Sequence, residues 1–413
     1  MTETLSGQPL NVVICGAGKT GHLTTVLFKQ LPDVKVTLLG SHPRLPEAYQ
    51  QHGKRLHALL PDGETLTATP DCVTCDPAEA CRDADVVIIT VPANFRADLL
   101  ARIVPHLPAD KPVYVGAIPG FCGFDWLAER ELAARPNAVI WGMKDVAHIA
   151  FDLLLGQSIK MGGEKATLYV ATHRRETAAS QQALMVLLQR LYSAPVVRLS
   201  DYLEITLTPG NPIMHSAVIY GLIGPYGQWH ARPFSQPLCW WNDCPELGAY
   251  YLERMDEENQ QLCAALETRL GVRLDSVLPL KQEIIDAYGD QIADAHTMLS
   301  VLPLKQEIID AYGDQIADAH TMLSVLRTNQ AYHGIGLPLR KYDAGGYVFD
   351  TQHRVFQEDI AYGLSLLVTI AENLAVSVPY IEEVYRWCSD YMGVSTQDRP
   401  DYFPPHWLTD EMG

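Results

Sequence analysis

The glycine-spaced turn near the start of the chain limits the possible folds more than any other stretch. Residues 11–22 read NVVICGAGKTGH, so a short apolar run leads directly into three glycines with the spacing G-x-G-x-x-G. The apolar run predicts a buried strand over residues 12–15, and residues 23–31 predict a helix after the turn. This order of strand, turn and helix is the one that a phosphate-binding loop requires.

Each glycine of the turn has its own physical reason to be there. Gly16 permits the tight turn, Gly18 lets the backbone approach a pyrophosphate, and Gly21 lets the helix pack closely on the strand. The pyrophosphate would lie at the positive N-terminus of that helix. We therefore predict a dinucleotide site here. Its predicted loop residues are Gly16, Ala17, Gly18, Lys19, Thr20 and Gly21.

The end of the second predicted strand favours one form of the cofactor. Residues 34–39 are an apolar run at the interval expected of a βαβ unit. NAD-preferring sites place Asp or Glu after this strand to bind the ribose 2′-hydroxyl, but this chain continues with Gly-Ser41-His-Pro-Arg44. Ser41 can donate a hydrogen bond to a 2′-phosphate, and Arg44 can pair with it. We therefore expect NADP(H), although Arg44 as a solvated loop charge would leave the choice open.

Further apolar runs continue the alternation of strands and helices. Residues 84–91 have the pattern of a strand buried on both faces, and its end brings Thr90, Val91 and Pro92 to the edge where open α/β sheets bind ligands. We add these three residues to the predicted cofactor site. The sequence also predicts strands over 111–118, 139–143 and 166–171 and a helix over 181–192. The fold class expected is α/β, with a Rossmann-type, doubly wound parallel sheet.

The chain changes character near residue 200. β-branched runs become rare after that point, and helical patterns with long polar loops replace them. At 413 residues the chain is also too long for one ordinary core. We therefore predict an NADP-binding Rossmann domain over residues 1–200 and a mainly α-helical substrate domain over residues 201–413, with the boundary placed to within about ten residues.

Net charge and cysteine content restrict the partners and the compartment. A net charge of −18 would repel nucleic acid and anionic membranes, so we expect neither as a partner. The N-terminus lacks the features of a signal peptide, and nine cysteines, an odd number, fit a reducing cytoplasm. Cys72, Cys75 and Cys81 lack a second pair at zinc-finger spacing, so we expect no metal.

An exact tandem repeat lies within the second half. Residues 276–299 read SVLPLKQEIIDAYGDQIADAHTML, and residues 300–323 repeat them without a change. Solenoid repeats diverge and come in at least three copies, so this pair indicates a recent duplication or a peculiarity of this one sequence. We expect one copy to fill the native position while the other bulges out, is disordered or exchanges with a partner chain.

Two polar motifs in the second half can carry chemistry. The first, TPGNPIMH over residues 208–215, is a rigid turn that opens a helix and ends at His215. The second, HRVFQEDIAYG over residues 353–363, puts Arg354 and Glu358 on one helical surface. From the residues alone, a structural histidine and a solvated ion pair remain the plainer interpretations.

In this order and spacing the motifs resemble those of opine dehydrogenases. The matching elements are the G-A-G-x-x-G loop, the N-P-x-x-H turn that ends at His215, and the R-x-x-x-E-D-x-x-x-G segment from Arg354 to Gly363. The chain looks closest to the bacterial opine-metallophore enzymes of the staphylopine, pseudopaline and yersinopine type. The resemblance implies that His215 is the catalytic histidine, Asp359 its carboxylate partner, and Arg354 an arginine near the substrate carboxylates.

The resemblance also implies a reaction. A 2-oxo acid, pyruvate or 2-oxoglutarate, would condense with the amine of a nicotianamine-like, histidine-derived substrate, and NADPH would reduce the imine. A histidine with the ordinary pKa of about 6.5 suits the proton transfers, and a carboxylate fixes its tautomer. The product would be a metallophore, and we expect small-molecule substrates and a homodimer. Residues 145–152 and 226–241 are candidates for selecting the substrate.

Two alternatives from other classes remain open. Another two-domain NADP-dependent reductase of 2-oxo or 3-hydroxy acids, such as a ketopantoate reductase, would share the glycine loop and a helical second domain. Those enzymes act on a single carbonyl substrate, so they would oxidise NADPH without an amine. A non-catalytic NADP-sensing protein would keep the fold and bind NADPH without turnover.

Overall fold

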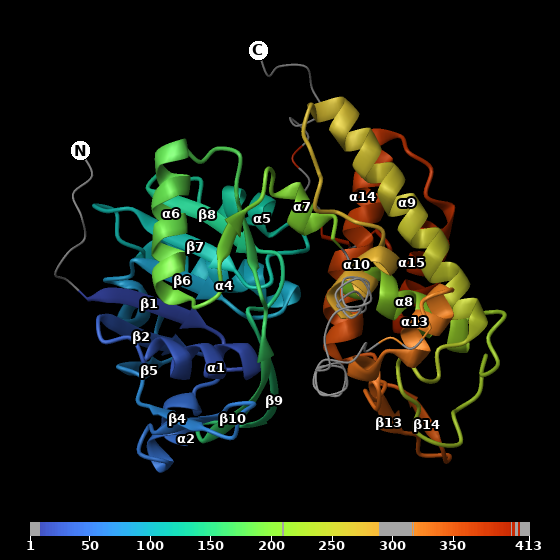
Figure 1. The fold of residues 1–413 in the computed structure, drawn as a ribbon, viewed down its shortest axis with the longest axis horizontal. Helices are drawn as coiled ribbons and strands as arrows, with labels where there is room; N and C mark the ends of the chain where they lie inside the picture. The colour runs from blue at the N-terminus through green and yellow to red at the C-terminus, as the bar shows by residue number, and fades with distance from the viewer. Residues whose placement is uncertain are drawn as a thin grey trace, which may run out of the picture. The chain divides into compact units, whose positions relative to one another are not determined.

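The chain divides by its internal packing into two units, Met1–Thr206 and Leu207–Gly413. The computed structural model describes residues 9–208, 210–288, 316, 318–397, 399–400 and 404. Most strands lie in unit 1, and unit 2 is mainly helical (Figure 1). The expected fold class, a Rossmann-type α/β domain followed by a helical domain, is confirmed.

Unit 1 is built on an eight-stranded sheet with the order β12-β11-β8-β7-β6-β1-β2-β5. Figure 1 shows β8, β7, β6 and β1 side by side in this unit. From β8 to β5 all neighbours run parallel, whereas β11 pairs with β8 in the antiparallel sense. The strands are β1 (Leu10–Cys15), β2 (Val34–Leu39), β5 (Cys72–Thr74), β6 (Val86–Ile89), β7 (Val113–Ala117), β8 (Ala138–Met143), β11 (Leu168–Thr172) and β12 (Val196–Arg198).

The parallel strands were the easiest part of the fold to predict. Every residue of β6 and of β8 is buried, and strands buried on both faces have continuous apolar sequences. Strand β2 occupies the residues expected of it, but β6 is shorter than residues 84–91. At Thr90, the residue after β6, the hydroxyl donates a hydrogen bond to the carbonyl of Cys15 at 3.1 Å.

A second sheet in unit 1 was not expected from the sequence. It has four strands in the order β4-β3-β10-β9, and helix α1 packs against it. Strands β3 and β4 have only four residues each and β10 contains two glycines, so these three carry little strand signal. Its strands are β3 (Leu56–Leu59), β4 (Thr65–Ala68), β9 (His148–Leu154) and β10 (Ser158–Glu164).

The helices of unit 1 are α1 (Lys19–Phe28), α2 (Leu45–Gln51), α3 (Pro77–Cys81), η1 (Ala93–Phe95), α4 (Arg96–Ile103), η2 (Val104–His106), α5 (Phe124–Glu131), α6 (Ala178–Leu191) and α7 (Leu203–Thr206).

Unit 2 is organised around helix α8 (Gly210–Ile223), which is buried along most of its length. Helix α8 packs against α9, η4 and α15, so it forms the centre of this helical unit. The other elements are α9 (Glu246–Leu270), α10 (Leu280–Tyr288), α13 (Met322–Thr328), η3 (Gln330–Tyr332), β13 (Leu339–Lys341), β14 (Tyr347–Phe349), η4 (Val355–Leu364), α14 (Ser365–Leu374) and α15 (Pro379–Met392).

The described parts of the duplicated block come from both of its copies. Helix α10 lies in the first copy, and α13 begins within the second. The two helices pack against each other, and the Nζ of Lys281 in the first copy donates a hydrogen bond to the carbonyl of His320 in the second at 2.6 Å. The expectation that a spare copy bulges out, is disordered or is exchanged falls on residues 289–315, which lie outside the described residues.

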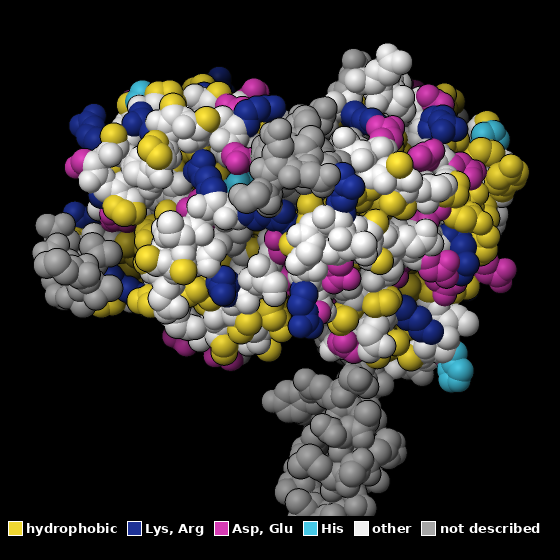
Figure 2. Space-filling model, turned by 90° about the horizontal axis from the view of Figure 1, so that it is seen from above, with side chains coloured by type: hydrophobic (Ala, Val, Ile, Leu, Met, Phe, Trp, Pro, Cys, Tyr) yellow, Lys and Arg dark blue, Asp and Glu magenta, His cyan; other side chains and the backbone are white. Residues whose placement is uncertain are grey.

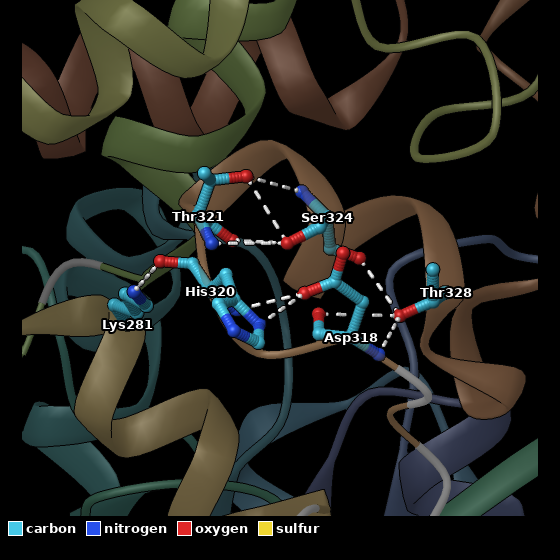
Figure 3. A network of polar contacts seen from close by, with 6 residues as sticks. All are labelled: Lys281, Asp318, His320, Thr321, Ser324 and Thr328. Carbon is cyan, nitrogen blue, oxygen red and sulfur yellow. Dashed lines mark hydrogen bonds and ion pairs between the residues drawn. The ribbon is translucent and has the colours of Figure 1, made fainter.

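The start of α13 is closed by a network of short polar side chains (Figure 3). The Ser324 backbone N–H donates to Thr321 Oγ1, and the Thr321 backbone N–H donates to Ser324 Oγ, each at 3.0 Å. Asp318 accepts a hydrogen bond from the His320 backbone N–H at 2.9 Å, and its own N–H donates to Thr328 Oγ1. This reciprocal capping fixes the start of helix α13, which lies at the end of the second copy.

The surface carries both signs of charge. On the face in Figure 2, basic side chains are scattered among the acidic ones, although the net charge is −18. An anionic ligand must therefore be met by local basic groups. In the described ranges, no helix combines the length and the apolar character that a membrane span requires.

Candidate functional site

The glycine turn after β1 has the geometry that a phosphate-binding loop needs. Gly16 has a φ of +126°, and a Cβ there would lie 2.5 Å from Thr90 Oγ1. A Cβ on Gly21 would lie 1.8 Å from the Gly16 carbonyl oxygen, which is a steric overlap. At Gly18 nothing lies within 4 Å of the Cβ position, so the turn is open there. Two of the glycines are required by packing, and the third leaves room for a pyrophosphate.

The predicted cofactor residues meet at one edge of the sheet. Strands β6, β1 and β2 are adjacent and parallel, so the segments that follow them start at the same edge. The glycine turn follows β1, Ser41 and Arg44 follow β2, and residues 90–92 follow β6. The Thr90 backbone N–H also donates to the Cys15 carbonyl at 2.9 Å, which ties the ends of β6 and β1 together.

Ser41 and Arg44 lie exposed just before helix α2. The Arg44 backbone N–H donates to His42 Nδ1 at 3.1 Å, and within the described structure its guanidinium has no hydrogen-bond or ion-pair partner. The first carboxylate after β2 is Glu47. An exposed hydroxyl and guanidinium with no carboxylate between β2 and α2 suit a ribose 2′-phosphate better than a ribose 2′-hydroxyl.

A buried arginine that sequence reasoning missed fixes the loops beside this edge. Arg96 in α4 is 2% exposed. Its guanidinium donates to the carbonyls of Val91 at 3.3 Å, Phe121 at 2.6 Å and Pro119 at 3.0 Å. These bonds join the loop after β6 to the loop after β7. An arginine on a short helix has the sequence pattern of a surface charge, so no local signal could have identified it.

His215 is partly exposed, although most of helix α8 is buried. Between Pro212 and Ile223 of α8 it is the one residue that is not buried, with 15% of its side chain exposed. Its Nδ1 lies 2.8 Å from Oδ2 of Asp359, a fully buried carboxylate 144 positions away in the chain. A hydrogen bond from Nδ1 to a carboxylate fixes the tautomer and leaves Nε2 for proton transfer.

Asp359 is placed by a π-helix. Residues 355–364 form the π-helix η4, which continues into α14. The ion pair between Arg354 Nε and Glu358 Oε2 spans 3.6 Å, with 54% of the arginine side chain exposed and 4% of the glutamate. We expected ordinary helical spacing here, and the wider turn is a departure from it. π-Helical turns are rare and often mark functional sites, but their sequences have no clear signal.

Aromatic rings lie against His215. The Trp240 ring centroid is 4.4 Å from that of His215, and the Trp241 centroid is 5.9 Å away. Tyr332 extends this row, 5.1 Å from Trp241. Both tryptophans end the 226–241 segment that the sequence offered as a candidate for substrate selection.

The cysteines that were considered for zinc have other partners. Cys72 Sγ donates to Glu79 Oε1 at 3.6 Å, and Cys75 Sγ donates to the His42 carbonyl at 2.9 Å. Over the part of the chain that the structure describes, no three His, Cys, Asp or Glu side chains form a group that could hold a metal ion.

Comparison with known proteins identifies the family. The profile of the NAD/NADP octopine/nopaline dehydrogenase alpha-helical domain matches residues 198–302 and 297–392, and that of ketopantoate reductase PanE/ApbA matches residues 12–115. The chain belongs to the opine dehydrogenase family. Each copy of the duplicated block falls within one of the two stretches matched by the helical-domain profile. As a family member, the protein is an oxidoreductase that uses a nicotinamide cofactor.

Several known proteins match this chain along nearly its whole length. The uncharacterized protein y4xO of Sinorhizobium fredii is 52% identical over 399 residues, which cover 96% of this chain and 99% of that protein. A structure of octopine dehydrogenase with NADH and L-arginine has a TM-score of 0.76 at 20% identity, covering 93% of this chain and 90% of that one. A structure of NADP⁺-bound yersinopine dehydrogenase has a TM-score of 0.66 at 17% identity, covering 98% and 96%.

Proposed function

We propose that this protein catalyses the NADPH-dependent reductive condensation of a 2-oxo acid, pyruvate or 2-oxoglutarate, with the amine of an amino-acid-derived substrate. The observation that carries the proposal is the 2.8 Å hydrogen bond between His215 and the buried Asp359, within a domain that matches the helical domain of octopine and nopaline dehydrogenases. The exposed Arg354 on the same π-helical segment supports it.

His215 and Asp359 would perform the proton transfers. The amine adds to the ketone, the resulting hydroxyl leaves with a proton as water, and the nitrogen loses a proton to give the imine. An imidazole whose Nδ1 is held by Asp359 can deliver and accept those protons through Nε2. The cofactor supplies a hydride to the imine carbon when it is bound. His215 would then keep the imine nitrogen protonated, so that the reduced product is a secondary amine.

Arg354 would hold the oxo acid. More than half of its side chain is exposed, and its ion pair with Glu358 uses Nε at the long distance of 3.6 Å. The terminal nitrogens can therefore form the bidentate pair that arginine makes with a carboxylate. On a chain with a net charge of −18, such a local cation is needed to hold an anionic substrate.

For the cofactor we propose NADPH rather than NADH. The octopine dehydrogenase structure is a complex with NADH and the yersinopine dehydrogenase structure is a complex with NADP⁺, so the fold alone leaves the choice open. The support comes from this chain's own turn after β2, where Ser41 and Arg44 are exposed and the next carboxylate is Glu47.

For the amine we propose a nicotianamine-like substrate derived from histidine, and for the product a metallophore. Support comes from the motifs shared with opine-metallophore enzymes and from the likeness to yersinopine dehydrogenase. Because the octopine dehydrogenase structure with L-arginine aligns at a higher TM-score, basic amino acids belong in the test panel. We also propose a homodimer in the cytoplasm, the compartment that fits nine unpaired cysteines.

The test is NADPH oxidation measured over pairs of oxo acids and amines, with detection of the condensed product by mass. We expect oxidation only when both substrates are present, and a product mass equal to their sum with the loss of water and the gain of two hydrogens. A His215→Ala variant that consumed NADPH at an undiminished rate would overturn the assignment of His215.

The match of residues 12–115 to ketopantoate reductase favours a second candidate, a reductase of a single 2-oxo acid. NADPH oxidation by an oxo acid without any amine would support that activity. Helices α8 and α9 contain no lysine that could serve as its general acid. Tight NADPH binding without turnover on the whole panel would instead indicate a cofactor-sensing protein.

A further inference from the structure

Trp240 covers one face of the His215 ring. Their ring centroids are 4.4 Å apart, and the planes are inclined by 31°. Trp240 is 5% exposed, so water has little access to that face. Because Asp359 holds the Nδ1 edge at 2.8 Å, the imidazole is restrained at one edge and on one face.

The loop that carries Trp240 is fixed by its own hydrogen bonds. The Trp240 backbone N–H donates to the Ile335 carbonyl at 2.8 Å. Arg327 donates from Nε and Nη2 to the Cys244 carbonyl, at 3.2 and 2.8 Å. These hydrogen bonds restrain the loop that holds the indole against His215.

The charged groups closest to this pair belong to the segment around η4. Asp359 is hydrogen-bonded directly to His215. His353 lies close enough for the charges of His215 and Asp359 to act on it. Partial burial, and then the charge of Arg354, lower the pKa of His353, so it contributes little positive charge near neutral pH.

Three carboxylates on the helices packed against α8 are bonded to groups other than His215. On α9, Asp256 accepts from the Leu280 backbone N–H at 2.8 Å, and Glu258 accepts from the first backbone N–H groups of α15. On α15, Glu383 accepts from the hydroxyls of Tyr220 and Tyr251. Direct stabilisation of a charged His215 therefore comes from Asp359 at its edge and from the rings of Trp240 and Trp241, of which Trp240 is the nearer.

We propose that Trp240 is a positioning residue that also stabilises the protonated form of His215 through a cation–π contact. An indole gives the strongest such contact among the aromatic side chains, and desolvation strengthens it. Its effect is to keep His215 protonated to higher pH, where it can still donate a proton during condensation. This inference rests on the catalytic role proposed for His215.

The test compares Trp240→Leu with Trp240→Phe and with the matched control Trp387→Leu. Trp387 lies on α15 and contacts Tyr220 and Tyr391 but, within the described structure, has no ring contact with His215. We would measure the pH profile of kcat/KM and titrate the His215 imidazole by NMR, with its signal assigned by its absence in His215→Ala. In Trp240→Leu we expect the ionisation seen in the pH profile and the one seen in the NMR titration to move to lower pH by roughly 0.7 pH unit.

Trp240→Phe should show a smaller shift in the same direction, and Trp387→Leu none. A folded Trp240→Leu protein with the wild-type titration and pH profile overturns the proposal. If that variant does not fold, an unshifted Trp240→Phe titration overturns it equally. Failure of the proposed function gives a different result, because His215→Ala would then retain activity whatever the titrations show.

Discussion

His22 in unit 1 and His215 in unit 2 each lie near the start of a helix that follows a glycine-containing turn. His22 is fully buried, neither ring nitrogen has a hydrogen-bond partner in the described structure, and burial lowers its pKa to about 4. His215 is partly exposed and bonded to Asp359. The comparison teaches that the partner and the solvent access, more than the residue type or its place on a helix, separate a histidine that only packs from one that can exchange protons with a ligand.

The sharpest way to break the comparison is to remove His215 and its carboxylate partner, singly and together. His215→Ala should lower kcat by about 10³-fold, because general acid–base catalysis of this kind contributes 10²–10⁴-fold. Asp359→Asn should lower it by about 10²-fold, and the double variant should lose no more than His215→Ala, since the pair acts as a unit. Steady-state kinetics check this, and losses that simply multiply would contradict it.

A substitution at Gly21 tests whether close packing fixes the glycine turn next to His22. Gly21→Ala places a Cβ 1.8 Å from the Gly16 carbonyl oxygen, so the free energy of unfolding should fall by about 3 kcal/mol. Gly18→Ala is the matched control, because its Cβ meets nothing within 4 Å, and it should change the stability by less than about 1 kcal/mol. Urea unfolding measures both, and equal losses would show that the turn is not packed as described.

His22 should make the protein less stable in acid. Its pKa is lowered from 6.5 to about 4 in the folded state, so unfolding is accompanied by proton uptake as the pH falls below 6.5. The stability from the neutral ring is present above pH 6.5, and about 2 kcal/mol of it is lost between pH 7 and pH 5. His22→Leu should remove that dependence and leave kcat unchanged. A pH-dependent loss of the same size in His22→Leu would assign it to other groups.

The smallest expected effect concerns cofactor choice. Arg44→Ala should reduce the preference for NADPH over NADH by about tenfold, the usual size for loss of one arginine–phosphate contact. The matched control is Arg130→Ala on α5, which removes an exposed arginine paired with Glu131. Specificity constants for both cofactors check the prediction. An unchanged ratio in Arg44→Ala would make Arg44 a solvated loop charge.

The parts of the fold that were predictable depend on local patterns. The parallel strands and the glycine turn are encoded within short stretches, because burial on both faces requires continuous apolar residues and a tight turn requires glycine. The small sheet of β3, β4, β9 and β10 was missed. Its β3–β4 and β9–β10 pairings are local, but the pairing of β3 with β10 that joins them brings together residues about 100 positions apart, such as Ala58 with Ile159.

The candidate site was likewise predictable only in part. The sequence named His215, Asp359 and Arg354 through their resemblance to a family pattern, and the structure forms the His215–Asp359 bond. The sequence could not reveal that Asp359 lies in a π-helix, that the Trp240 ring lies against His215, or that Arg96 is buried. Each of these depends on how the folded chain arranges its backbone and side chains, which leaves no periodicity in the sequence to detect.

By itself the sequence determined a nucleotide-binding α/β half, a helical half and the identity of the polar residues available for chemistry. The tertiary structure decided which of those residues meet. His22 and His215 could not be distinguished by hydrophobic pattern, because their surroundings are made by other parts of the chain. A carboxylate 144 residues away and a tryptophan held by a distant loop give His215 its environment, whereas close packing alone surrounds His22.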